Sequence, residues 1–171
     1  DIVERYLTSR AVHPVIIRHC IDNKLLFESA DYHNAVFIGY DTSGKARYGA
    51  LRGTVGNYKG ELTGSDKRFS FSLNENPATD YVHVFESAID LLSFATLELL
   101  EGRDWKAETL LSLAGVFRTK RDGVVPVALT QFLNEHPSIY QIRLHLDNDA
   151  VGRCAAEGIG SGLQGKYQVF D

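Results

Sequence analysis

The sequence contains no methionine, only two cysteines and a single tryptophan among its 171 residues. Cys20 and Cys154 are too far apart for a C-x-x-C motif, so we expect two reduced thiols of the kind found in cytosolic proteins. The six histidines form no H-x-x-x-H pair and no Cys/His cluster, which argues against a structural zinc site. Because the sequence begins with Asp1 and lacks an initiator methionine, we expect a piece of a longer protein with further domains.

Long apolar runs and an excess of basic residues are also missing. No run approaches the roughly 20 apolar residues that span a bilayer, and the charged first ten residues lack the apolar core of a signal peptide. We therefore expect no membrane contact and a cytoplasmic location. Lys and Arg number 18 against 22 Asp and Glu, and this net charge of −4 excludes a simple polycationic coat for nucleic acid.

The first half of the chain predicts two helices followed by strands. Helical spacing of apolar residues over 3–26 is broken at His13-Pro14, which predicts a short helical hairpin. A turn rich in Asp, Ser and Gly between two apolar runs predicts a β-hairpin, and the alternation of RFSFSL predicts another strand. These predicted strands are 34–40, 46–52 and 68–73. The polar segment 74–80 predicts a linker.

The second half alternates between predicted strands and helices. The strands are 81–85, 110–113, 140–146 and 167–170, and the helices between them are 88–100, 127–134 and 150–158. This order is typical of βαβ units and a parallel sheet. We therefore predict an α/β protein in which a small α+β subdomain, 1–78, precedes a parallel-sheet domain of βαβαβαβ order, 79–171.

Four acidic residues follow two of these strands, where parallel sheets carry their sites. Glu86 and Asp90 follow the first strand, and Asp147 and Asp149 follow the third; strand periodicity would place the last two on the same side. Taken alone, Asp90 is explained as favourable charge at a helix N-terminus, and Asp149 as an N-cap. Convergence of several carboxylates is better explained by Mg²⁺ or Mn²⁺, which prefer oxygen ligands.

Three segments near these strand ends resemble the Toprim domain, which is shared by DnaG-type primases, topoisomerases and some nucleases. They are VFESAID (84–90), SLAG (112–115) and LDNDAVGR (146–153). The resemblance implies that Glu86, Asp147 and Asp149 bind the metal and that Asp90 completes the catalytic set. Ser87 departs from the glycine usual in primases, and would either narrow access or cap the helix.

Three segments of the first half resemble, more faintly, the basic subdomain that precedes Toprim in these primases. They are YLTSR (6–10), FIGYDTSGK (37–45) and KGELTGSDKR (59–68). The two-part arrangement is similar to an uncharacterised Toprim family carried on bacterial mobile elements. The resemblance implies metal-dependent phosphoryl transfer on nucleic acid in DNA replication, with primase-like nucleotidyl transfer as the first reading. Phosphodiester hydrolysis by a nuclease, and a catalytically idle nucleic-acid-binding accessory module, stay open. A receiver-like domain is disfavoured because a lysine expected at a late strand end is missing.

Basic and aromatic residues are interleaved over residues 43–68 and just beyond. Six bases against two acids, together with Tyr48, Tyr58 and Phe69, suit a surface that neutralises phosphates and stacks bases. A solvated hairpin surface explains the same pattern, but the Toprim resemblance favours a nucleic-acid-binding surface. The expected nucleic acid is DNA in preference to RNA, and nucleotides are expected as additional partners. The candidate nucleic-acid contacts are Lys45, Arg47, Arg52, Lys59, Lys67, Arg68 and, beside the acids, Arg153.

Two other patterns predict structure and no chemistry. The glycines of residues 160–165 fit G-x-G-x-x-G, but they follow a predicted helix and precede a strand, so we expect a flexible turn. His83 and His145 lie inside predicted strands near the acids, and we expect them to pack there and not to ligate a metal, given the oxygen character of the site.

Overall fold

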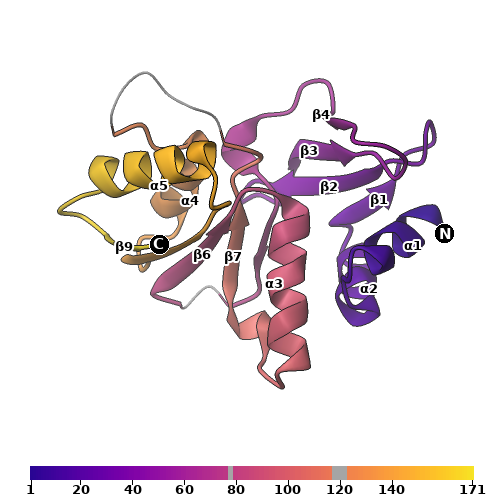
Figure 1. Cartoon of the computed structure of the whole chain (residues 1–171), viewed down its shortest axis with the longest axis horizontal. Helices are drawn as coiled ribbons and strands as arrows, with labels where there is room; N and C mark the ends of the chain where they lie inside the picture. Colours follow the sequence, from indigo (N-terminus) through magenta and orange to yellow (C-terminus); the bar gives the residue numbers. More distant parts are fainter. Residues whose placement is uncertain (77–78, 117–122) are drawn as a thin grey trace.

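The computed structural model describes residues 1–76, 79–116 and 123–171. Figure 1 shows two β-sheets joined through a long helix. The helices are α1 (Ile2–Ser9), α2 (Pro14–Asp22), α3 (Ala88–Leu100), α4 (Val127–Glu135) and α5 (Ala150–Gly162), with short 3₁₀ helices η1 (Lys67–Phe69) and η2 (Trp105–Ala107). The strands are β1 (Leu26–Glu28), β2 (Ala35–Tyr40), β3 (Ala46–Arg52), β4 (Lys59–Glu61), β5 (Ser72–Asn74), β6 (Tyr81–Phe85), β7 (Thr109–Ser112), β8 (Gln141–His145) and β9 (Gln168–Phe170).

The first sheet is antiparallel and the second is mainly parallel. The first has the order β1-β2-β3-β4, and the second has the order β5-β7-β6-β8-β9. In the second sheet β6, β7, β8 and β9 are parallel, and β5 pairs antiparallel with β7 at one edge. The predicted α/β fold with a small preceding unit is therefore confirmed, and β5 is an additional edge strand.

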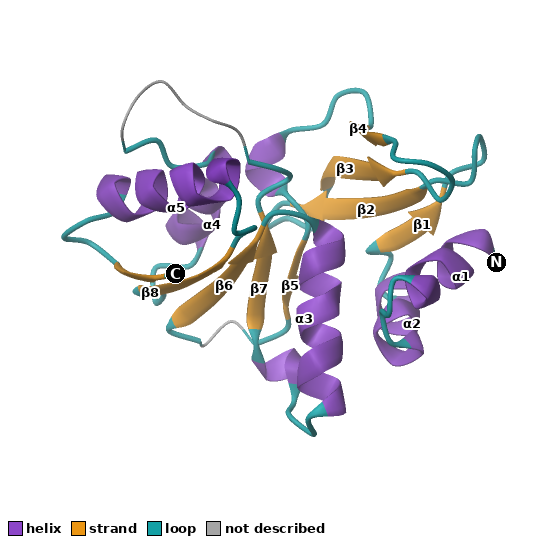
Figure 2. Ribbon diagram, in the orientation of Figure 1, coloured by secondary structure: helices purple, strands orange, loops and turns teal. Residues whose placement is uncertain are grey.

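Two hydrophobic cores hold these elements together. Figure 2 shows α4 and α5 on one side of the second sheet and α3 on the other. One core lies between α4, α5 and one face of the second sheet, around Leu129 and Ile142. The other joins α1, α2 and the first sheet to α3 on the opposite face, around Leu7, Phe37 and Leu91. Since α3 packs against β6 and β7 of the second sheet and also contributes to this shared core, the first sheet is held beside the second. The boundary between residues 78 and 79 stays a prediction.

Local sequence explains where the key helices begin. Pro14 occupies the first turn of α2, where its missing N–H costs nothing, and the His13 side chain accepts a hydrogen bond from the Val15 N–H. The His13 backbone N–H donates to the Thr96 hydroxyl on α3 at 3.0 Å, which fixes the helical hairpin against α3. Ser87 is the N-cap of α3.

Two expectations about local structure were wrong. Residues 68–73 do not form one strand, because Asp66 caps η1 by accepting a hydrogen bond from the Arg68 N–H, and β5 begins only at Ser72. The glycines at 160 and 162 belong to α5, not to a turn. A Cβ at Gly162 would lie 2.4 Å from the Gly123 carbonyl oxygen, so the missing side chain lets that backbone approach the helix. The predicted linker 74–80 includes residues 77–78, which lie outside the described residues.

Candidate active-site cleft

The carboxyl ends of β6 and β8 bring Glu86 and Asp147 together. These strands are parallel neighbours, and Phe85 pairs with His145 at the last step of their register. The chain then leaves the sheet at both places, and the Asp147 backbone N–H donates a hydrogen bond to Glu86 Oε1 at 3.1 Å. Two predicted site residues, 61 positions apart in the sequence, are therefore direct neighbours.

Asp90 lies one turn into α3, beside the same strand end. The Ser87 hydroxyl donates to Asp90 Oδ2 at 2.6 Å, and the Asp90 backbone N–H points back at the Ser87 oxygen at 3.4 Å. This reciprocal pair resembles a capping box, with aspartate in place of glutamate. One oxygen of Asp90 is held by Ser87, and the exposed carboxylate lies at the mouth of the site.

The turn after β8 is shaped by Asp149 and Gly152. Because β8 ends at His145, strand periodicity does not extend to Asp147 and Asp149. Asp149 is instead the N-cap of α5, and its Oδ1 accepts hydrogen bonds from the N–H groups of Val151 (2.9 Å) and Gly152 (2.7 Å). The Asp147 carbonyl oxygen packs so tightly over Gly152 that a Cβ there would be 2.0 Å away.

A third strand end completes the floor of the site. After β7, the Gly115 N–H donates to the Glu86 carbonyl oxygen at 2.8 Å, and the Ala114 N–H donates to the Ser112 hydroxyl at 3.2 Å. Ala114 and Gly115 both adopt positive φ, 59° and 90°. The turn therefore folds back against Glu86, and it belongs to the SLAG segment.

The carboxylates around Glu86 change its pKa. Burial raises the pKa of the Glu86 carboxyl, and the nearby charges of Asp147, Asp149 and Asp90 raise it further, against the opposing hydrogen bond from Asp147. Four acids from two strand ends therefore share one electrostatic environment, as expected of carboxylates that converge.

These acids face the first sheet across a cleft of about 680 Å³. Glu86, Asp90 and Asp147 lie on one side, and Asp149 is not among the lining residues. The opposite wall comes from the end of α1, from β3 and β4, and from η1. Its polar side chains are Arg10, Tyr48, Arg52, Lys59, Glu61 and Lys67.

Comparisons with known families and structures agree with this geometry. Residues 83–170, more than half of the chain, match the family model described as Toprim-like. The chain belongs to the Toprim-like family. Residues 5–77 match a second family, described as a protein of unknown function (DUF3991). No curated protein matches the chain.

The solved structures similar to this Toprim-like chain include primase domains. The primase fragment of the bacteriophage T7 primase-helicase is 17% identical with a TM-score of 0.60, over 95% of this chain and 62% of that one. The Aquifex aeolicus primase is 15% identical with a TM-score of 0.60, over 96% and 47%. A DnaG primase catalytic domain bound to single-stranded DNA is 13% identical with a TM-score of 0.60, over 98% and 62%. This chain thus spans less than two thirds of each, and the likeness shows a shared fold.

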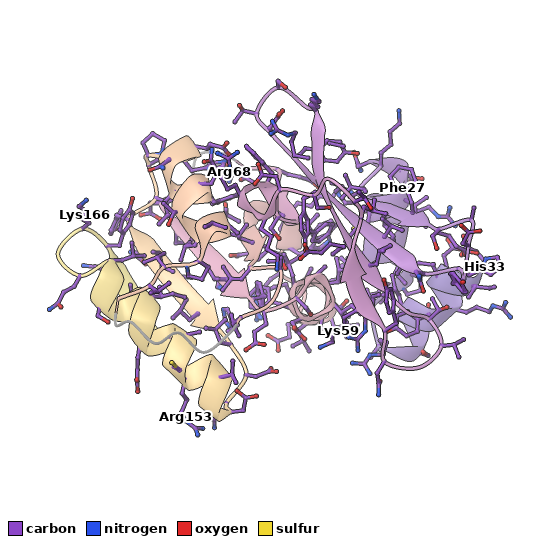
Figure 3. The ribbon with its side chains drawn as sticks, turned by 90° about the horizontal axis from the view of Figure 1, so that it is seen from above. Phe27, His33, Lys59, Arg68, Arg153 and Lys166 are labelled. Atoms are coloured by element: carbon purple, nitrogen blue, oxygen red, sulfur yellow. The ribbon has the colours of Figure 1, made fainter. Side chains whose placement is uncertain are left out.

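The basic residues predicted from the sequence fall into three groups in this Toprim-like protein. Arg52, Lys59 and Lys67 line the cleft. Arg47 and Arg68 are paired with acids, Arg47 with Asp41 and both with Asp66, and they flank the Phe69 ring. Figure 3 shows Arg68 and Lys59 on different sides of the molecule. Lys45 lies in the exposed hairpin turn, and Arg153 donates to the carbonyl and side-chain oxygens of Asn148 beside α5.

Sequence reasoning missed three residues of the cleft wall. Arg10, at the end of α1, closes the YLTSR segment, which carries part of the faint primase resemblance but is not among the candidate contacts. Glu61 and Tyr48 were counted only within the composition of the basic segment, yet both line the cleft. In the residues that the structure describes, Arg10, Arg52 and Lys59 form no ion pair, whereas Lys67 is 2.9 Å from Glu61 Oε1.

The carboxylates fit a hard divalent cation in their chemistry. Mg²⁺ is typically held by one or two carboxylates, with water and phosphate oxygens completing its shell. Glu86 and Asp147 offer such a pair at a solvent-accessible position, with Asp90 beside them. Among the described residues, no three His, Cys, Asp or Glu side chains are already arranged around one point. The site therefore suits a cation that brings its own water or phosphate ligands.

His83 and His145 pack beneath this site, as the sequence predicts. His83 Nδ1 lies 2.7 Å from His145 Nε2, and the rings pack with Phe85 and Phe94. Burial, with contributions from His145 and Arg143, lowers the pKa of His83 to about 4. The pair is thus held neutral beneath the acids.

None of the helices in the described ranges has the length and apolar character needed to cross a membrane.

Proposed function

We propose that this chain is a metal-dependent domain that transfers nucleotidyl groups on nucleic acid, as primases do. One observation carries the proposal: a single cleft sets the carboxylates of Glu86, Asp90 and Asp147 opposite cations that have no acidic partner in the described structure. A cleft with acids on one wall and free cations on the other suits a polyanion that is bridged to the acids by a divalent cation.

In this proposal, Glu86 and Asp147 hold Mg²⁺ or Mn²⁺, with Asp90 beside them and Asp149 orienting the turn. When bound, the metal ion neutralises charge on the transferring phosphate and lowers the pKa of a hydroxyl that attacks it. Asp149 acts through its hydrogen bonds to α5, which fix where Asp147 lies. Glu86, with its raised pKa, is suited to take up or release a proton during the reaction.

The cationic wall would hold the phosphates of the nucleic acid or nucleotide. Arg52 pairs directly opposite Lys59 in the β3–β4 ladder, so their side chains share the face that lines the cleft. Arg10 adds a third charge from α1. Lys67, Arg47, Arg68 and Arg153 have partners within the chain, so we assign the stronger phosphate contacts to Arg10, Arg52 and Lys59.

A second candidate is a nucleic-acid-binding accessory module without catalysis. It is favoured by the hydrogen bonds that engage Glu86, Asp90 and Asp149, and by the lack of a ready-made three-ligand metal site in the described ranges. Hydrolysis of a phosphodiester by the same site is a further outcome, in which water attacks the phosphate in place of a nucleotide hydroxyl.

Primer synthesis on single-stranded DNA with Mg²⁺ or Mn²⁺, run beside nicking of supercoiled DNA, tests the proposal. We expect oligonucleotide synthesis that Asp147→Asn abolishes and that Glu101→Gln, a carboxylate change outside the cleft, leaves intact. Cleavage lost in Asp147→Asn would assign a nuclease. DNA binding without either activity would assign the accessory module and refute the enzymatic proposal.

A further inference from the structure

One carboxylate lies on the cationic wall of the cleft, where its charge opposes phosphate binding. Glu61 is the acid that the first sheet contributes to the cleft lining, and its side chain is about one third exposed. It lies at the end of β4, two residues from Lys59, so both side chains point to the same face of the strand, about 6.7 Å apart. On its other side lies Lys67, with Nζ 2.9 Å from Glu61 Oε1.

Neighbouring side chains contact one carboxylate oxygen of Glu61, Oε1, and leave the other, Oε2, for a ligand. The Tyr48 hydroxyl donates to Oε1 at 3.2 Å, and Lys67 contacts the same oxygen. Burial and the Glu61 charge raise the pKa of Tyr48, so its hydroxyl keeps the proton that it donates. Across the ladder Glu61 pairs with Ala50, whose small side chain also lines the cleft. Among the residues that the structure describes, none donates a hydrogen bond to Oε2.

We infer that Glu61 recognises a ribose 2′-hydroxyl, and so makes this cleft prefer RNA or ribonucleotides to their deoxy counterparts. The inference rests on the proposed binding of nucleic acid in the cleft. A carboxylate repels phosphate but accepts a hydrogen bond from a neutral donor. Glu61 lies beside Lys59, which is assigned a phosphate, so the group of a nucleic-acid strand that faces Glu61 is the sugar next to that phosphate. The 2′-hydroxyl is the donor by which a protein distinguishes RNA from DNA at one site.

Three fluorescein-labelled single strands of equal length and sequence test the inference by fluorescence anisotropy: ribose, 2′-deoxyribose and 2′-O-methyl. We expect the wild-type protein to bind the ribose strand about five- to tenfold more tightly than the other two, as one hydrogen bond of ordinary net strength supports. The 2′-O-methyl strand keeps RNA-like sugar geometry but has no donor, so it separates the hydrogen bond from shape.

Glu61→Ala should make the three affinities equal, because it removes the acceptor, whereas a glutamine amide would offer an N–H₂ donor to the 2′-oxygen. Glu101→Gln, a carboxylate change outside the cleft, should retain the preference. Binding of all three strands with equal affinity, or a preference that survives Glu61→Ala or includes the 2′-O-methyl strand, would overturn the inference while leaving nucleic-acid binding intact. No binding of any strand would refute the proposed function itself.

Discussion

Replacing Gly152 with alanine should disturb the acidic turn more than any other single methyl group in α5. A Cβ at this position would lie 2.0 Å from the Asp147 carbonyl oxygen, 2.9 Å from its carbon and 3.1 Å from its nitrogen. All three are backbone atoms, so no side chain can rotate away. Because real Cβ atoms essentially never come within 3.0 Å of such atoms, the turn and the helix must separate by about 1 Å or more.

That separation has an energetic and a functional consequence. Overpacking of this kind costs about 1–3 kcal/mol, which for a chain of this size lowers the melting temperature by roughly 2–12 °C. The shift also pulls the Asp147 N–H away from Glu86 Oε1, so the two carboxylates lose their common position. We therefore expect weaker Mn²⁺ binding at a temperature where the variant is still folded.

Gly160→Ala is the matched control in the same helix. A Cβ at Gly160 would meet no atom within 4 Å, so alanine there should stabilise the helix by up to about 1 kcal/mol. Thermal unfolding followed by circular dichroism, together with Mn²⁺ titration by electron paramagnetic resonance, compares the two variants. Equal stability and equal Mn²⁺ affinity in both would refute the idea that close packing over Gly152 positions Asp147.

Two other predictions concern the residues around the acids. Between pH 7 and pH 5 the unfolded chain protonates His83 while the folded protein does not, so the free energy of unfolding falls by about 2 kcal/mol as the pH is lowered. Urea unfolding of His83→Leu should show a correspondingly smaller decrease over the same pH range. An unchanged pH dependence in this variant would contradict the burial of a neutral imidazole. Ser87→Ala removes both the N-cap of α3 and the hydroxyl that holds Asp90, so we expect a loss of about 1 kcal/mol and weaker Mn²⁺ binding. Ser87→Thr should restore both, and full metal affinity in Ser87→Ala would show that Asp90 needs no support.

The second half of the fold could be predicted closely because its signals are local. The strand at 81–85 and the helix at 88–100 have the predicted bounds, since an uninterrupted apolar run meets a serine cap. The meeting of Glu86 and Asp147 also followed from one general rule, that parallel strands bring their carboxyl ends to one edge. The strand predicted at 68–73 overlaps β5 only at residues 72–73, and its antiparallel pairing with β7 escaped prediction because it joins residues far apart in sequence.

The cleft wall could not be predicted, because it depends on how two sheets sit against α3. Arg10 enters the cleft only through the shared core of α1, α2 and α3, which no local pattern encodes. Arg47 and Arg68 looked equivalent to Arg52 in the sequence, but Asp66 binds both of them. Composition could count the charges of this segment, but not which of them remain unpaired.

The central claim is that the acids at the ends of β6 and β8 bind a divalent cation, and calorimetric titration with Mn²⁺ and Mg²⁺ tests it most directly. We expect saturable binding to the wild-type protein that is lost in Glu86→Gln and Asp147→Asn. Glu101→Gln should bind as the wild type does, and thermal unfolding should show all variants folded. No binding to the wild type, or equal binding by every variant, would contradict the account.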